Sequence, residues 1–322
     1  MVLILSEKDV SSLLDVPAAV RQMEAAFVEL ARGRALTPAR FSVPIPQSYG
    51  TFRLMPSVLL DSKASGFKVL AGTAGHRLPG KGYFLVALLD FDDGSIECIM
   101  GASRLTQIRT GAVSALATQY LARRDSTSFG LVGAGVQGQG QVEAICQTLR
   151  PSEVLIYDPD RAKASRMAEG ARSAFGVRAR AVETVDEAVA ADVVSTATTS
   201  TSPVLNISNV RAGTHVNAIG SNVPARKEID PALLRASKVV VDLRDQALQE
   251  SGDLEPVRSG ELPATTIYGE LAEIVAGTKP ARTDDAEITI FKSVGIALQD
   301  IAVAKLLYDR ALEAGVGTRV EL

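Results

Sequence analysis

Apolar residues recur at helical spacing in two segments of the first third of the chain. In the first, a start signal at Asp15 and Pro17 precedes apolar residues three or four apart, Val20, Met23, Phe27 and Leu30, and Gly33 ends the pattern. The second segment, 105–122, is rich in Ala and Thr and predicts a long helix. Between them, strands are predicted for RFSVPI, TFRLMPSV, GFKVLAG, YFLVALLDF and IECIM, with a hairpin turn at 92–94. This part is therefore predicted to be mixed α+β.

The pattern changes after residue 125. Short apolar strands now alternate with amphipathic helices that start near Gln137, Arg161, Asp186 and Pro231. That alternation is typical of an α/β fold with a parallel sheet and crossover helices. A last helix, at about 295–314, is expected to pack on the first domain. We therefore predict two domains, one formed by residues 1–123 and 296–322 and the other by 124–295.

A glycine-rich turn opens the second domain. It follows an apolar strand, precedes a helix and fits G-x-G-x-x-G with Gly133, Gly135, Val136, Gln137 and Gly138. Such glycines permit a tight turn and close approach of a pyrophosphate to the helix N-terminus. Dinucleotide binding is favoured over a purely structural turn because Asp158 ends the next strand, twenty residues after Gly138, where it would accept hydrogen bonds from ribose hydroxyls.

Asp158 also bears on the choice of cofactor. A carboxylate repels a 2′-phosphate, which favours NAD(H), whereas the nearby Arg161 would compensate that phosphate and keeps NADP(H) possible. Thr196 and Thr198 lie at another strand end, where a cofactor contact and a capped strand end are equally compatible with the pattern. A further strand, HVNAIG, ends in a turn at Gly220-Ser221-Asn222.

Four cations of the first domain lie among apolar or small residues: Arg40, Arg53, Lys68 and Arg109. A buried cation needs an internal carboxylate or an anionic ligand. Taken singly, each fits a structural ion pair or an extended side chain on the surface. Several such cations beside a hydride-carrying cofactor favour a pocket for a substrate carboxylate, which Arg binds in a bidentate manner.

Composition narrows the function classes. The 322 residues include 46% hydrophobic and 22% charged residues, and 34 Lys+Arg against 37 Asp+Glu give a formal charge of −3. We expect no nucleic-acid or membrane partner from this balance. MVLILSEKD resembles neither a signal peptide nor an anchor, and Cys98 and Cys146 are expected to be reduced, so we expect a cytoplasmic protein. With only His76 and His215, no metal site is expected.

Longer motifs resemble one family. RTGAVSALATQYLAR, GAGVQG, GTHVNAIGSNVPARKEID, FKSVGIALQDIAVAK and GVGTRVEL are similar to the ornithine cyclodeaminase/mu-crystallin family over nearly the whole chain. The resemblance implies a homodimer with a Rossmann domain and a substrate-binding, dimerising domain built from the N-terminal third and the last helix. Its members include cyclodeaminases, alanine dehydrogenases, reductases of cyclic ketimines and mu-crystallin.

The resemblance also implies residue roles. Arg40, Lys68 and Arg109 would hold the carboxylate and the amino or imino region of a small amino or imino acid, and Val294 would touch it, whereas Arg53 is expected to be structural. The cofactor would be lined by Gly135 to Gln137, Asp158, Thr198, Val216, Asn217, Ala218, Ile219, Arg226 and Ser293. The family brings a Thr, Gln or His towards the nicotinamide from the segment that contains Lys81 and Tyr83, and here Lys81 is interpreted as a solvent-facing turn residue.

One departure from the family pattern concerns the reaction. Cyclodeaminases resemble GGDCPGK where this chain has Asn222, and their Asp transfers protons. Reduction of a preformed cyclic imine needs mainly positioning, with Asn222 orienting water or substrate and Lys68 assisting protonation. We therefore expect an NAD(P)H-dependent oxidoreductase that reduces pyrroline-2-carboxylate or piperideine-2-carboxylate to L-proline or L-pipecolate. The alternatives are an alanine dehydrogenase-like enzyme, an ornithine cyclodeaminase, or a non-enzymatic binding protein like mu-crystallin.

Overall fold

Two separate β-sheets organise the chain. The computed structural model describes residues 1–45, 50–72 and 82–321. It divides into unit 1, Met1–Arg109 with Ile296–Leu322, and unit 2, Thr110–Gly295. The boundary falls within helix α3 (Ser103–Leu121), so that residues 110–123, which we expected in the first domain, belong to unit 2. The functional roles expected of the two domains stay predictions.

Unit 1 contains a mostly antiparallel sheet in the order β16-β1-β7-β6-β5-β4-β2, with β3 paired to β4. Only the β1–β7 pair is parallel among the strands that the structure describes. The strands are β1 (Val2–Leu5), β2 (Ala35–Leu36), β3 (Phe41–Ile45), β4 (Gly50–Leu59), β5 (Ala64–Gly72), β6 (Gly82–Leu89), β7 (Ile96–Gly101) and β16 (Thr318–Val320). The five strands predicted from the sequence are thereby confirmed.

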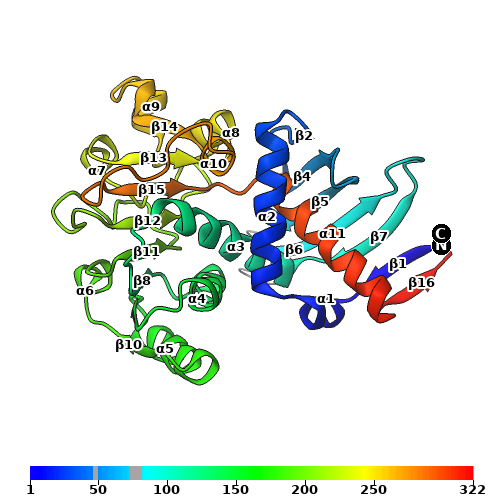
Figure 1. Ribbon diagram of the computed structural model, residues 1–322, viewed down its shortest axis with the longest axis horizontal. Helices are drawn as coiled ribbons and strands as arrows, with labels where there is room; N and C mark the ends of the chain where they lie inside the picture. The colour runs from blue at the N-terminus through cyan, green and yellow to red at the C-terminus, as the bar shows by residue number, and fades with distance from the viewer. Residues whose placement is uncertain (46–49, 73–81, 322) are drawn as a thin grey trace. The chain divides into compact units, whose positions relative to one another are not determined.

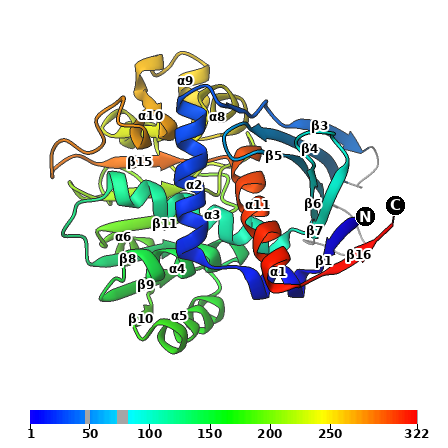
Figure 2. The ribbon, with the colours of Figure 1, turned by 45° about the vertical axis from the view of Figure 1, so that its right-hand side comes forward.

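Helices cover one face of this sheet. They are α1 (Glu7–Leu13), α2 (Val16–Ala31) and α11 (Ala297–Ala314). Helix α11 packs against β4, β5 and β6, and α2 packs against α11 (Figure 2). The predicted start of α2 is confirmed, because the Asp15 carboxylate accepts a hydrogen bond from the backbone N–H of Ala18 at 2.6 Å. Gly33, at φ +67°, follows the helix as expected.

Unit 2 contains an eight-stranded sheet in which every pair of neighbours is parallel (Figure 1). The strands are β8 (Ser128–Val132), β9 (Glu153–Tyr157), β10 (Arg178–Ala181), β11 (Val193–Thr196), β12 (His215–Ala218), β13 (Lys238–Val241), β14 (Ile267–Glu270) and β15 (Thr289–Lys292). Most are nearly continuous apolar runs that are buried on both faces, as a parallel sheet requires. The predicted α/β Rossmann fold is confirmed.

The order of this sheet, β10-β9-β8-β11-β12-β15-β13-β14, places the first strand near the middle. The chain winds outwards from β8 in one direction and then starts again at β11, which makes the carboxyl ends of β8 and β11 the topological switch point where dinucleotides bind in such sheets. The helices of the unit, besides the end of α3, are α4 (Val136–Thr148), α5 (Arg161–Phe175), α6 (Val185–Val189), α7 (Pro231–Arg235), α8 (Arg244–Glu250), α9 (Glu255–Arg258), α10 (Leu271–Val275) and the 3-10 helix η1 (Ala264–Thr266).

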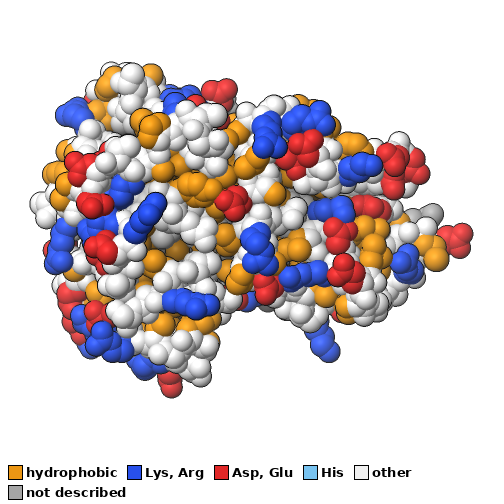
Figure 3. Space-filling view, viewed as in Figure 1, with side chains coloured by type: hydrophobic (Ala, Val, Ile, Leu, Met, Phe, Trp, Pro, Cys, Tyr) orange, Lys and Arg blue, Asp and Glu red, His pale blue; other side chains and the backbone are white. Residues whose placement is uncertain are grey.

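The exterior carries charges of both signs. Figure 3 shows lysine, arginine, aspartate and glutamate side chains interspersed over the face in view. No helix in the described part of the chain is both long and apolar enough to cross a bilayer. Within residues 1–45, 50–72 and 82–321, no group of three or more His, Cys, Asp or Glu side chains is arranged to hold a metal ion.

Candidate active site

Polar residues follow the carboxyl ends of the central strands of unit 2. Gly133 follows β8, Asp158 follows β9, Asp242 follows β13 and Ser293 follows β15, while the Gly220-Ser221-Asn222 turn lies two residues beyond β12. Because all these strands are parallel, their carboxyl ends lie along one edge of the sheet. That edge is the ligand-binding edge of open α/β sheets.

The glycine loop is shaped by close backbone contacts. Gly133 has φ +105°, and a Cβ there would lie 2.7 Å from the carbonyl oxygen of Ala197. A Cβ at Gly138 would lie 2.1 Å from the carbonyl oxygen of Gly133. These two positions therefore need glycine for the fold itself.

Gly135 differs from both. It is the N-cap of α4 and makes no side-chain cap, and a Cβ there would meet no heavy atom within 4 Å. Its φ of −85° suits any residue, so the fold does not require glycine. Open space in front of the N-terminus of a 13-residue helix is what a pyrophosphate occupies in a dinucleotide site. The loop thus fits the expected cofactor.

Asp158 is fixed beside this loop. Its carboxylate accepts hydrogen bonds from the backbone N–H groups of Ala134 (2.8 Å) and Asp160 (2.9 Å). Arg161, which kept NADP(H) possible, forms an ion pair with Glu183, and its side chain is 70% exposed. A carboxylate held at the loop, with the nearest expected cation engaged elsewhere, favours NAD(H) over NADP(H).

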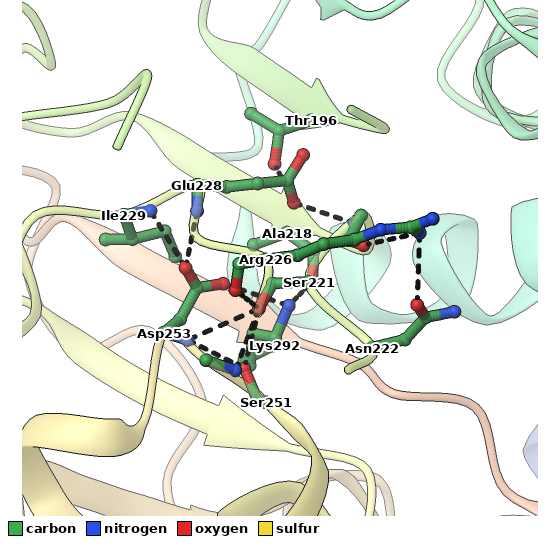
Figure 4. Close-up of polar contacts among 12 residues, drawn as sticks. Thr196, Ala218, Ser221, Asn222, Arg226, Glu228, Ile229, Ser251, Asp253 and Lys292 are labelled. Carbon is green, nitrogen blue, oxygen red and sulfur yellow. Dashed lines mark hydrogen bonds and ion pairs between the residues drawn. The ribbon is translucent and has the colours of Figure 1, made fainter. Parts of the chain in front are cut away.

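Glu228 makes hydrogen bonds to two of the loops that follow the strands. Its side chain is fully buried and accepts hydrogen bonds from the Thr196 hydroxyl (2.9 Å) and from the backbone N–H groups of Thr198 (2.8 Å) and Gly220 (2.7 Å). Figure 4 shows the carboxylate lying between Thr196 and the turn. Burial raises the pKa of Glu228, although the ammonium group of Lys292 opposes this. One side chain therefore sets the conformation of both the Thr198 loop and the Gly220 turn.

Lys292 and Asp253 complete this buried network. The Lys292 ammonium group donates to the carbonyl oxygen of Ala218 and lies 3.1 Å from an Asp253 carboxylate oxygen, with both side chains fully buried. The other Asp253 oxygen accepts from the backbone N–H groups of Glu228 (2.6 Å) and Ile229 (3.0 Å). The ion pair thus fixes the chain on either side of the turn (Figure 4).

The turn itself does not depend on the Asn222 side chain. The Ser221 hydroxyl donates to the carbonyl oxygen of Arg226 (2.6 Å) and accepts from the backbone N–H of Gly252 (3.1 Å). Asn222 is half-buried, and its amide oxygen accepts from the Arg226 guanidinium at 3.3 Å. Figure 4 shows Asn222 and the head of Arg226 at the outer side of the network.

The other cofactor residues expected along β12 and β15 lie deeper. Val216, Asn217 and Ala218 have fully buried side chains, and the Asn217 amide donates to the Thr118 hydroxyl at 3.0 Å. Ile219 is 7% exposed. A cofactor contact from residues 216–218 would therefore have to use the backbone, and their roles stay predictions.

Asp242 holds the segment after β15. Its Oδ2 accepts from the Ser293 hydroxyl (2.8 Å) and from the backbone N–H groups of Val294 (3.0 Å) and Gly295 (2.8 Å). Ser293 and Val294 are expected to contact cofactor and substrate. The hydrogen bonds to Asp242 hold this segment in one conformation, which precise positioning needs.

In unit 1, two of the expected cations converge on one carboxylate. Asp300 Oδ1, on α11, accepts from the Lys68 ammonium group (2.9 Å) and from Nε of Arg109 (3.0 Å). Nη1 of Arg109 also donates to the Gln299 amide oxygen at 2.6 Å. Lys68 is 1% exposed, Arg109 7% and Asp300 0%. Burial lowers the pKa of Lys68 to about 8, although Asp300 opposes this.

The remaining residues of the first domain are less closely defined. Arg40 and Arg53 are half-buried, and Tyr83 is 59% exposed. Lys81 lies outside the described residues. The roles expected for them stay predictions.

Sequence reasoning missed six buried polar residues of these networks: Glu228, Asp242, Asp253, Lys292, Gln299 and Asp300. A signal was present for some of them. Lys292 ends the apolar strand TIFK, Lys68 interrupts GFKVLAG, and Asp300 is the one charged residue in the mostly apolar stretch IALQDIAVA. A charge inside an apolar segment indicates a buried ion pair.

A methyl group at position 135 should separate cofactor binding from folding. We expect Gly135→Ala to leave the free energy of unfolding within about 0.5 kcal/mol of the parent, because apart from its chain neighbours the Cβ would meet no heavy atom of the described residues within 4 Å. We expect it to raise the Kd for NADH at least about tenfold, since the methyl occupies the space that a pyrophosphate would approach. Calorimetric NADH titration and urea denaturation measure the two quantities.

The matched control is Gly170→Ala in α5, where a Cβ also meets nothing within 4 Å. Alanine there should stabilise the helix by about 0.5–1 kcal/mol and leave the Kd unchanged. Parent-like NADH binding by Gly135→Ala would contradict the assignment of the loop.

Comparisons with known proteins agree with this architecture. Delta(1)-pyrroline-2-carboxylate reductase of Bacillus cereus is 38% identical over 324 residues, which cover 99% of this chain and 99% of that protein. The structure of Thermococcus litoralis Delta(1)-pyrroline-2-carboxylate reductase in complex with NADH and L-proline is 38% identical, covers 99% of this chain and 100% of that one, and superposes with a TM-score of 0.94. An archaeal alanine dehydrogenase dimer with bound NAD is 34% identical, covers 100% and 99%, and also gives a TM-score of 0.94.

These similarities extend over the motifs from which the family resemblance was inferred. The family model described as "Ornithine cyclodeaminase/mu-crystallin family" matches residues 2–315. The chain belongs to the ornithine cyclodeaminase/mu-crystallin family.

Proposed function

We propose that this protein is an NADH-dependent reductase that converts a small cyclic α-imino acid, pyrroline-2-carboxylate or piperideine-2-carboxylate, into L-proline or L-pipecolate. The observation that carries the proposal is the buried Lys68–Arg109–Asp300 cluster, in a chain similar over its whole length to pyrroline-2-carboxylate reductases. A cytoplasmic location is supported by the expected use of NADH and by the two free, buried cysteines, Cys98 and Cys146.

The charge of this cluster favours an anionic substrate. Two buried cations contact Asp300, and among the described residues no second carboxylate contacts either of them. Within the described residues the group thus has two cations and one carboxylate, and a buried charge without a partner is costly. An α-carboxylate would neutralise it and would offer oxygens that an Arg can bind in a bidentate manner.

The residues of unit 2 support the cofactor half of the proposal. Gly133, Gly135 and Gly138 would hold the pyrophosphate at the N-terminus of α4, and Asp158 the adenosine ribose. When bound, reduced nicotinamide supplies the hydride that the imine carbon accepts. The Glu228 and Asp242 networks hold the surrounding loops, so that the protein mainly orients its reactants.

The identity of residue 222 helps to distinguish between cyclodeamination and simple imine reduction. Cyclodeamination needs repeated proton transfer, for which a carboxylate is suited. Asn222 does not titrate, and its amide is able to orient water or the substrate nitrogen by hydrogen bonding. This supports simple C=N reduction and counts against cyclodeamination.

An alanine dehydrogenase-like reaction is the second candidate. The archaeal alanine dehydrogenase superposes with the same TM-score as the pyrroline-2-carboxylate reductase. Both reactions form an amino acid by hydride addition to an imine beside a carboxylate, so the cation cluster suits either.

We further propose that two copies associate through the face of the unit 1 sheet opposite α11. Lys68 points to α11, so its neighbour Val69 points to the other face. The register places Val69 in a row with Phe41, Leu54 and Leu85. Phe41 is 64% and Leu85 39% exposed. An exposed apolar row of this kind marks an interface, and the archaeal alanine dehydrogenase is a dimer.

Purified protein should oxidise NADH when pyrroline-2-carboxylate or piperideine-2-carboxylate is added. The loss of near-ultraviolet absorbance of the reduced nicotinamide gives kcat/KM, and NADH should be preferred to NADPH because Asp158 repels a 2′-phosphate. Turnover with pyruvate plus ammonia alone would establish the alanine dehydrogenase-like reaction instead. Formation of proline and ammonia from L-ornithine would revive the cyclodeaminase, and cofactor binding without turnover of any imine would favour a binding protein.

Asn222→Asp should retain much of the reductase activity, since the turn is held by Ser221 and Glu228. We expect kcat/KM for the cyclic imine to stay within about tenfold of the parent, a change of roughly 1.4 kcal/mol in the activation barrier. Near-complete loss, with unaltered folding by circular dichroism, would show that the amide makes an essential hydrogen bond.

Leu85→Glu should dissociate the dimer, because burying an unpaired carboxylate in an apolar interface is unfavourable. Sedimentation velocity should then show a monomer where the parent sediments as a dimer. Ile207→Glu, at a position of unit 2 that is 47% exposed, is the matched control and should not change the mass. A monomeric parent, or a dimeric Leu85→Glu variant, would exclude this interface.

A further inference from the structure

Asp300 is the centre of the buried charge cluster in unit 1. It lies in the first turn of α11, and its side chain is fully buried. Oδ1 accepts from both Lys68 and Arg109, while Oδ2 is buried and has no hydrogen-bond partner among the described residues.

The groups around Lys68 act in opposite directions on its proton. Burial and the positive charges of Arg109, from α3, and Arg40, from the loop between β2 and β3, lower the pKa of Lys68. Asp300 alone among the charged groups named here raises it. The Phe84 ring of β6 lies 5.3 Å from the ammonium group and also favours the charged form. The outcome is a pKa of about 8.

We propose that Asp300 is a positioning residue of the imine-reducing site, which aims the Lys68 ammonium group and Arg109 and keeps Lys68 protonated as the proton donor to the substrate nitrogen. This inference rests on the proposed function. Oδ1 of Asp300 accepts from both cations, so the contacts of this oxygen are with Lys68 and Arg109. It acts through Lys68.

The reaction balances with Lys68 in this role. The imine carbon gains a hydride from NADH, which brings two electrons and one hydrogen, and the C=N double bond becomes single. The substrate nitrogen forms its new N–H bond with a proton of Lys68, whose electron pair stays on Nζ. Neutral Lys68 then takes a proton from solvent. Each imine thus consumes one NADH and one proton.

Asp300→Asn tests the role, because asparagine keeps the size and one acceptor oxygen and removes the charge. In the parent, kcat/KM for pyrroline-2-carboxylate should fall as the pH rises past about 8, where Lys68 loses its proton. In Asp300→Asn the fall of kcat/KM should occur at a pH at least about one unit lower. At alkaline pH this amounts to an approximately tenfold loss of kcat/KM, which a more acidic buffer reverses. Ionisation of the substrate affects both proteins equally. The difference between the pH values at which kcat/KM falls in the two proteins therefore reports on the protein.

Binding gives an independent readout. Calorimetric titration of the cofactor-free protein with pyrrole-2-carboxylate, a planar anion without a reducible C=N bond, should show the same shift in the pH at which affinity falls. The matched control is Asp309→Asn on the same helix, since Asp309 pairs with Lys305 at the surface. It should leave both profiles unchanged.

The outcomes separate the inference from the proposed function. A parent without activity on any cyclic imine would overturn the proposed function, while the binding titration would still test Asp300. An active parent whose kcat/KM falls at the same pH as that of Asp300→Asn would overturn the role of Asp300. If Asp300→Asn does not fold, Asp300→Glu is the deciding variant. A lowered kcat with kcat/KM falling at the same pH as in the parent supports a positioning role. An unchanged kcat with kcat/KM falling at the same pH overturns it.

Discussion

Burying an ammonium group costs several kcal/mol unless a carboxylate lies against it, and both units of this protein contain such a pair. Lys68 lies against Asp300 in unit 1, and Lys292 lies against Asp253 in unit 2. In each case the carboxylate also fixes other groups, Arg109 in the first and the backbone of residues 228 and 229 in the second. Removing one partner would leave a buried charge and release a whole segment, so the arrangement of the candidate site depends on these two pairs.

The two pairs are used differently. In unit 2 the charged groups make hydrogen bonds to backbone N–H and carbonyl groups, and these hydrogen bonds hold the loops in place. In unit 1 two cations share one oxygen of a single carboxylate, and no second carboxylate among the described residues contacts them. The unit 2 network pairs its polar groups with backbone partners, whereas the two cations of unit 1 suit an additional carboxylate from a ligand.

Much of unit 2 was predictable because its signals are local. The strand, the glycine turn and the N-terminus of α4 lie within residues 128–148, and Asp158 follows at the end of the next strand. The ion pairs were not predictable, because Lys68 and Asp300 are 232 residues apart. An apolar context shows that Lys68 needs a partner, but only the fold determines which carboxylate reaches it. The expected cofactor residues of β12 show the same limit, since strand register decided that their side chains are buried.

The turn at Gly220-Ser221-Asn222 has an evolutionary consequence. Its backbone is fixed by the Ser221 hydroxyl and by the Glu228 carboxylate, whereas the side chain of residue 222 contacts only Arg226 among the hydrogen bonds of this network. The chemical group presented there is therefore nearly independent of the scaffold that presents it. A single codon change can exchange an amide for an acid without rebuilding the loop, and one ancestral framework is thereby able to give rise to enzymes with different proton requirements.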